Sequence, residues 1–184
     1  MRIALAVEGT RGDIHPMLAL AVRLRERGHD ALLCAPPDFA EDAAAQGVPF
    51  HCVGMSVRAY LETQADFLHG TALQSLRAGK RYFQDSIERQ FRDLAAGVAR
   101  ADWILAAGPQ LAAASVAQAI GARYRFISYC PSLLNSPYQT PFVVPRGSLH
   151  PWLNRLAWWG TLRFLSSALR GPVDRSTIAG GVMR

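Results

Sequence analysis

The chain has 184 residues, 50% hydrophobic and 18% charged, so it has enough apolar side chains for a core and too little charge for a disordered chain. Its formal charge is +6, but it has a single lysine and scattered arginines, which argues against a nucleic-acid partner. Cys34, Cys52 and Cys130 lie far apart and form no CxxC pair, so neither a disulfide framework nor a structural zinc site is indicated. The first residues lack the apolar run of a signal peptide. We therefore expect one large cytoplasmic domain.

Short apolar runs alternate with segments of helical spacing through the first 130 residues. We predict strands at 2–7, 31–35, 48–53, 103–107 and 124–129. We predict helices that begin near Pro16 and end at Gly28, and that span about 38–46, 80–99 and 111–120. This alternation, with short connections, implies an α/β, Rossmann-like three-layer domain with a parallel sheet flanked by helices.

The remaining segments are less regular. Residues 54–79 predict loops and short helices, and the proline-rich residues 135–151 predict an irregular loop beyond the carboxyl end of a strand, where open α/β sheets usually bind ligands. Residues 152–169 predict a helix rich in tryptophan and leucine. We expect one domain over 1–170 and an irregular tail over 171–184, which we interpret as the start of an interdomain linker.

The segment that follows the first strand, residues 9–16 (GTRGDIHP), carries the most information. Glycines let backbone amides approach a ligand, and a helix N-terminus favours negative charge, so Gly9, Thr10, Arg11 and Gly12 would suit a nucleotide. Val7 stands where the first glycine of a dinucleotide fingerprint would be, and the lysine of a P-loop is absent. A structural alternative makes Asp13 simply the N-cap of the first helix.

Residues 9–16, followed by Leu18-Ala19-Leu20 and Arg27-Gly28-His29, resemble the amino-terminal motif of GT-B glycosyltransferases. The resemblance is nearest to bacterial enzymes that glycosylate natural products such as glycopeptides, and to sterol glucosyltransferases. Residues 35–36, 47–50 and 101–108 support it, and it covers roughly residues 1–170. It implies the acceptor-binding half of a two-domain fold, whose partner would be a carboxyl-terminal domain that binds the nucleotide sugar.

The resemblance also implies a catalytic base. In plant and macrolide enzymes a histidine follows the second glycine of this loop, whereas Asp13 stands there in this chain, as in the glycopeptide branch. Such a base removes the acceptor hydroxyl's proton during attack on the anomeric carbon, which contributes about 10²- to 10⁴-fold in rate. Direct displacement would invert the configuration at that carbon. A carboxylate base needs a partly desolvated site that raises its pKa. His15 is the second candidate base, with exposure or a capping role as its structural alternative.

The acceptor expected from the resemblance is a hydrophobic small molecule, and the co-substrate is a nucleotide-diphosphate sugar. No cofactor or metal is expected. Aromatic and methionine side chains suit an apolar ligand, although each alone is more often part of a core. The candidate acceptor-binding residues lie after the third and fifth strands: Met55, Tyr60, Phe67, Tyr82, Phe83, Ser132, Asn135, Tyr138 and Phe142.

Apolar residues surround most of the predicted helix at 152–169, which therefore needs burial on more than one side. We expect a second half-domain to cover it, with the protein's own sheet and loop as one alternative. The other is peripheral contact with a membrane, aided by Arg155, Arg163 and Arg170. Two further function classes stay open: a stand-alone α/β ligand- or nucleotide-binding domain, and a noncatalytic scaffold for another subunit.

Overall fold

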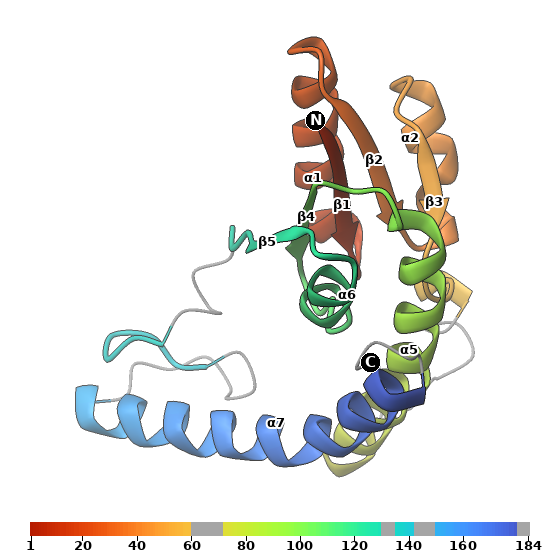
Figure 1. Ribbon diagram of the computed structural model, residues 1–184. Coiled ribbons are helices and arrows are strands. Elements are labelled where there is room, and N and C mark those ends of the chain that lie inside the picture. Colours follow the sequence, from red (N-terminus) through yellow and green to blue (C-terminus); the bar gives the residue numbers. More distant parts are fainter. Residues whose placement is uncertain (60–71, 130–134, 142–149, 180–184) are drawn as a thin grey trace. The chain divides into compact units, whose positions relative to one another are not determined.

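A computed structural model describes residues 1–59, 72–129, 135–141 and 150–179, and, within these, the side chains outside 72–84, 165 and 168–179 (Figure 1). The chain divides into two compact units, one of residues 1–127 with residues from 172 on, the other of residues 128–171. The domain boundary expected at residue 170 stays a prediction.

The first unit is built on a parallel sheet flanked by helices, as the alternating pattern predicts (Figure 1). Its elements in chain order are β1 (Arg2–Val7), α1 (Arg11–Glu26), β2 (Asp30–Ala35), the 3₁₀ turn η1 (Pro37–Phe39), α2 (Ala40–Ala45), β3 (Phe50–Cys52), α5 (Ala72–Val98), β4 (Trp103–Ala107), α6 (Ala113–Ile120) and β5 (Arg123–Phe126). The strand order is β3-β2-β1-β4-β5. All four strand pairs are parallel, so the loops that follow the strands meet at one edge.

The position of β1 at the centre of the sheet explains why its sequence is apolar from Ile3 to Val7. It pairs with β2 on one side and β4 on the other, with Leu5 opposite Leu33 and Leu105. Residues Ile3 to Val7 are buried, because helices cover both faces of the sheet. Ile14 and Met17 of α1 are buried in the same cluster as Leu5 and Leu33. The core therefore holds the carboxyl end of β1 and the first turns of α1 in fixed positions.

Several boundaries differ from those predicted. Helix α1 begins at Arg11, so Pro16 lies inside it, because Thr10 and Asp13 cap the helix one turn earlier. Strand β3 is shorter than 48–53, and β5 ends at Phe126 rather than 129. Both lie at the edges of the sheet, where a strand has only one neighbour to pair with.

Helix α5 begins at Ala72 rather than 80, so residues 72–79 are helical, whereas 60–71 lie outside the described residues. Helix α7 (Pro151–Ala179) extends beyond the predicted end at 169. The expectation of an irregular tail is therefore wrong for residues 171–179, where Gly171 and Pro172 are accommodated within the helix. Residues 180–184 lie outside the described part.

In the second unit, residues 135–141 accept hydrogen bonds from side chains in the amino-terminal part of α7. The Asn154 side-chain amide donates to the Pro137 carbonyl at 2.8 Å, and the Trp158 indole N–H donates to the Gln139 carbonyl at 2.8 Å. These bonds satisfy backbone carbonyls of a segment that has no regular secondary structure. Of the helices that the structure describes, none is long and apolar enough to cross a membrane.

Candidate functional site

The loop between β1 and α1 places Asp13 at the carboxyl edge of the sheet. Thr10 is the N-cap of α1, in extended conformation, and Asp13 is the third residue of the helix. Asp13 Oδ2 accepts the Thr10 backbone N–H at 3.0 Å and the Thr10 hydroxyl at 3.4 Å. The alternative prediction that Asp13 is the N-cap of this helix is wrong, because Thr10 is the N-cap and Asp13 completes a capping box. The half-buried carboxylate of Asp13 has a fixed orientation at the positive end of α1.

Two glycines let the surrounding backbone approach Asp13. Gly9 has φ +127°, and a Cβ there would overlap Asp13 Oδ2. Gly108, which follows β4, has φ +63°, and its Cβ would overlap the Glu8 carbonyl oxygen and lie 3.7 Å from Asp13 Cβ. Asp13 therefore sits where the loops after β1 and β4 meet, and a side chain at either glycine would displace its surroundings.

A buried polar network, which the sequence analysis missed, adjoins this loop. Glu8, Ser86 and Gln90 are each at most 1% exposed. The Ser86 hydroxyl donates to Glu8 Oε1 at 3.3 Å, and the Gln90 amide donates to the Ser86 hydroxyl at 3.0 Å. The sequence signal was a charged residue that directly follows the apolar run of β1, since a buried carboxylate requires polar partners.

The same network reaches the connection after β4. The Gln90 amide also donates to the Pro109 carbonyl at 3.3 Å, and Gln90 Oε1 accepts the Leu111 N–H at 2.9 Å. Gly108 immediately precedes Pro109 in the chain and lies close to Asp13 and Glu8. Helix α5 therefore fixes the two loops that enclose Asp13.

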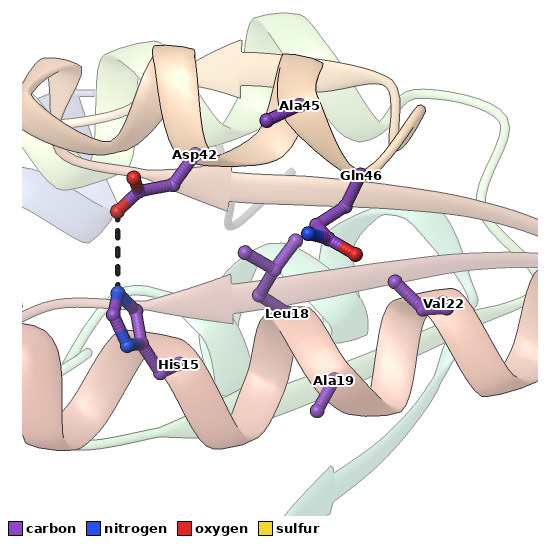
Figure 2. A pocket seen from close by; sticks show the side chains of 7 residues that line it. All are labelled: His15, Leu18, Ala19, Val22, Asp42, Ala45 and Gln46. Carbon is purple, nitrogen blue, oxygen red and sulfur yellow. Dashed lines mark hydrogen bonds and ion pairs between the residues drawn. The ribbon is translucent and has the colours of Figure 1, made fainter.

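His15 points from α1 toward Asp42 of α2, as Figure 2 shows. Its Nε2 lies 3.2 Å from Asp42 Oδ2 of α2, and its ring meets Phe39 edge-on. Two residues along a helix turn a side chain by about 200°, so Asp13 and His15 point in different directions. His15 lines a cavity of about 310 Å³ between α1 and α2, whose other lining residues are Leu18, Ala19, Val22, Asp42, Ala45 and Gln46.

A larger cavity, of about 810 Å³, opens beside the β1–α1 loop. Thr10 and Arg11 line it from one side, and Val57 and Arg58, which follow β3, line it from another. The remaining lining residues belong to η1 and α2: Pro37, Asp38, Phe39, Ala40, Glu41 and Asp42. Two guanidinium groups and three carboxylates make this lining more polar than an aromatic pocket. Such a cavity suits a ligand that carries several hydrogen-bonding groups.

Asp38 anchors the segment after β3 at this cavity. Its carboxylate accepts the Ser56 hydroxyl at 2.7 Å and the Val57 N–H at 2.9 Å. On the other side of β3, Asp93 of α5 accepts the Gly54 N–H at 3.2 Å. Asp38 and Asp93 were not among the residues predicted from the sequence, because neither occurs in a recognisable motif.

The predicted acceptor-binding residues are described only in part. Met55 is half-buried, Asn135 is exposed, and Tyr138 is 86% exposed. Tyr82 and Phe83 lie in α5, with side chains outside the described part. Tyr60, Phe67, Ser132 and Phe142 lie outside the described residues. The acceptor-binding set stays a prediction.

Two cysteines of the described residues are free thiols. Burial raises the pKa of Cys34 to about 12. The pKa of Cys52 is also raised, first by desolvation and then by the negative charges of Asp93, Asp38 and Glu8. Both thiols therefore stay protonated near neutral pH and are poor nucleophiles. In the part of the chain that the structure describes, no group of three or more His, Cys, Asp and Glu side chains is placed to hold a metal ion.

Comparison with known proteins identifies relatives of this chain. The family described as "Glycosyltransferase family 28 N-terminal domain" matches residues 3–124. Glycosyltransferase GtfE of Amycolatopsis orientalis is 39% identical over 77% of this chain and 34% of its own length. Vancomycin aglycone glucosyltransferase of the same organism is 35% identical over 86% of this chain and 38% of its own length. The chain thus spans little more than a third of the curated relatives it matches.

The fold is also found among solved structures. The Streptomyces sp. SF2575 glycosyltransferase SsfS6, complexed with thymidine diphosphate, superimposes with a TM-score of 0.56 and 19% sequence identity. The match covers 93% of this chain and 45% of the other. It supports the same arrangement of strands and helices.

Proposed function

The chain belongs to the glycosyltransferase family 28 N-terminal domain family, and from this premise we propose that it is the acceptor-binding half of an inverting glycosyltransferase. The reaction transfers a sugar from a nucleotide-diphosphate sugar to a hydroxyl group of a hydrophobic small molecule. Two relatives support that acceptor class by their names, the vancomycin aglycone glucosyltransferase and a sterol 3-beta-glucosyltransferase of Arabidopsis thaliana. A carboxyl-terminal domain supplies the nucleotide-sugar site.

The geometry of Asp13 is the observation that carries the proposal. Its carboxylate lies at the carboxyl edge of a parallel sheet, the usual ligand edge of such folds, and is held by Thr10. Gly9 and Gly108 keep the backbone close around it. In the proposed mechanism, Asp13 accepts the acceptor's hydroxyl proton while the oxygen attacks the anomeric carbon and the nucleoside diphosphate departs. Because the attack displaces the leaving group directly, the anomeric configuration inverts.

The β1–α1 loop is also the proposed contact with the donor's phosphates. Thr10 and Arg11 line the larger cavity, and Arg11 is exposed there at the positive end of α1. Gly9 and Gly12 leave the neighbouring backbone accessible. The thymidine diphosphate in the SsfS6 structure supports a nucleotide as the leaving group. We further propose a cytoplasmic location, which the free thiols of Cys34 and Cys52 support.

The test of the base uses this chain joined to the carboxyl-terminal half of a relative. Asp13→Asn keeps the size of the side chain but removes its ability to accept a proton, so kcat should fall about 10²-fold or more. His15→Gln is the matched control, because His15 faces Asp42 instead of Gly9 and Gly108. Its kcat should change less than about threefold. If His15→Gln abolished transfer while Asp13→Asn preserved it, the base would be His15.

A second experiment separates a half-enzyme from a stand-alone binding domain. Positioning of two reactants supplies roughly 7 to 11 kcal/mol of the acceleration, and one half-domain holds only one of them. Residues 1–184 alone should therefore show no sugar transfer with any nucleotide sugar, while the joined protein should gain it. Robust turnover by residues 1–184 alone would refute the proposed division between two halves. Lack of turnover in every fusion would favour a binding domain without catalysis.

A further inference from the structure

Two arginines line the larger cavity, of about 810 Å³, beside the β1–α1 loop. Arg11 and Arg58 are both exposed, and neither forms an ion pair with any residue that the structure describes. By comparison, Arg23 at the other end of α1 pairs with Glu26 at 2.7 Å. The volume of the cavity is in the range of small-molecule sites. The cavity can therefore offer guanidinium groups to a ligand.

The carboxylates of the same lining are less available to a ligand. Asp42 lies 3.2 Å from the His15 ring nitrogen (Figure 2). Asp38 accepts two hydrogen bonds from the segment that follows β3. Glu41 is the third carboxylate, and it is exposed. The cavity also adjoins the first residues of α1, where the helix dipole is positive. The groups that remain for a ligand therefore favour a negative charge.

Arg58 belongs to a turn whose backbone is held by hydrogen bonds. The Ser56 hydroxyl oxygen accepts the Ala59 N–H at 3.0 Å, and the hydroxyl donates to Asp38 at 2.7 Å. The Asp38 carboxylate also accepts the Val57 N–H at 2.9 Å. The residues on both sides of Arg58 are therefore fixed before a ligand arrives. Such preorganisation lowers the entropy that is lost on binding.

The two arginines reach the cavity from different loops. Arg11 lies two residues before Asp13, in the loop that we propose to contact the donor's phosphates. Arg58 follows β3, three residues after Met55, in the part of the chain expected to bind the acceptor. Thr10 lines the cavity and is hydrogen-bonded to Asp13. An acceptor whose hydroxyl group reaches Asp13 can thus extend into the cavity.

Building on the proposed transfer reaction, we propose that Arg58 binds a carboxylate of the acceptor, so that the enzyme selects acidic acceptors over neutral ones of the same shape. A guanidinium presents parallel N–H groups that match the two oxygens of a carboxylate. A neutral acceptor leaves Arg58 to water and gains no ion pair. Glu41 has the same sign of charge as the bound carboxylate, so it weakens the attraction without contacting Arg58's ligand directly.

The first measurement is the binding of two probes to residues 1–184, followed by NMR. The probes are ferulate and methyl ferulate, which share the aromatic ring and the hydroxyl group and differ in charge. Ferulate should bind about fivefold more tightly at low ionic strength, the advantage expected of one exposed ion pair. Added salt should reduce this difference, because the Debye length shortens. The backbone amide signals of residues 56–59 should shift with ferulate.

Variants assign the preference to Arg58. Arg58→Gln should bring the ratio of the two dissociation constants close to one by weakening ferulate alone. Arg58→Lys keeps the charge but loses the planar fork, so it should retain part of the preference. Glu41→Gln should strengthen ferulate binding about twofold, since it removes a like charge. The matched control is Arg100→Gln, which removes an exposed arginine that precedes β4 at the opposite edge of the sheet and should keep the parent ratio. Circular dichroism and thermal melting confirm that every variant is folded.

The same preference should appear in the reaction. In the joined protein, kcat/KM should be about fivefold higher for ferulate than for methyl ferulate, and Arg58→Gln should abolish the difference. Equal kcat/KM for the two probes would overturn the selection of acidic acceptors and leave the transfer reaction standing. A joined protein that transfers sugar to neither probe, while residues 1–184 still prefer ferulate, would contradict the proposed function and leave the carboxylate site standing.

Three results of the binding experiment would overturn the proposal. The first is equal affinity for the two probes, or no saturable binding of ferulate, at low salt. The second is the same loss of ferulate binding in Arg100→Gln as in Arg58→Gln. The third is obtained with thymidine diphosphate as a competitor. If it shifts the signals of residues 56–59 and displaces ferulate, Arg58 serves the donor instead of the acceptor.

Discussion

Replacement of Gly9 by alanine should be the most damaging single methyl addition in the β1–α1 loop. Gly9 has φ +127°, which side chains of L-residues rarely allow, so the backbone would have to move at a cost of about 1 to 3 kcal/mol. The new Cβ would overlap Asp13 Oδ2 and force the carboxylate off the Thr10 N–H. Loss of a helix cap costs about 0.5 to 2 kcal/mol. With both contributions, the free energy of unfolding should fall by about 1.5 to 5 kcal/mol.

Gly12→Ala is the control in the same motif. Gly12 is exposed in the first turn of α1, and a Cβ there meets nothing within 4 Å. Alanine in a helix is favoured over glycine by about 0.5 to 1 kcal/mol, so this variant should be unchanged or slightly more stable. The two substitutions add the same methyl group three residues apart. The structure nevertheless predicts a loss of stability for Gly9→Ala and no loss for Gly12→Ala.

Urea unfolding followed by circular dichroism measures both values in the chain of residues 1–184. In the protein joined to a carboxyl-terminal half, Gly9→Ala should also lower kcat, because the proposed mechanism requires the Asp13 carboxylate to face the acceptor hydroxyl. A Gly9→Ala stability within about 0.5 kcal/mol of the parent chain would refute the tight contact described here. So would a loss on Gly12→Ala as large as that on Gly9→Ala.

Three further predictions concern stability. Gln90→Leu should lower the free energy of unfolding, measured in urea, by about 3 kcal/mol, because it leaves buried groups such as the Leu111 N–H without a hydrogen-bond partner. A loss below about 1 kcal/mol would show that the hydrogen bonds of Gln90 contribute little to stability. The unfolded Cys34 thiol ionises near its ordinary pKa of 9, whereas the folded one holds its proton to about 12. Stability should therefore be unaffected by this group below pH 9 and fall by about 1.4 kcal/mol per pH unit between 9 and 12. Cys34→Ala should remove that part of the slope, and identical slopes in the two proteins would argue against a buried thiol. Asp42→Asn, which breaks the exposed pair of His15 and Asp42, should lower the free energy of unfolding by less than about 1 kcal/mol in the same urea assay at pH 6. A larger loss would contradict the expectation that an exposed pair contributes little to stability.

The amino-acid sequence determined the sheet, because its signals are local. The strands predicted at 2–7 and 103–107 coincide with β1 and β4 at both ends, since central strands of a covered parallel sheet are nearly continuous apolar runs. The motif at 9–16 likewise located the β1–α1 loop at the carboxyl edge of the sheet. Positions less constrained by burial gave less accurate predictions. The edge strands are shorter than expected, and α5 and α7 extend past the segments that show helical spacing.

Tertiary structure alone decided which side chains meet. Sequence placed Asp13 and His15 together as candidate bases, but the helical turn between them sends one toward Gly9 and the other toward Asp42. Nothing local links Glu8 with Ser86, because a hydrogen bond across 78 positions exists only after α5 packs beside the sheet. The direction of α7 was equally hidden. Its composition predicted an apolar helix, whereas in the structure Asn154 and Trp158 are buried and hydrogen-bonded, and Trp152 and Trp159 point outward.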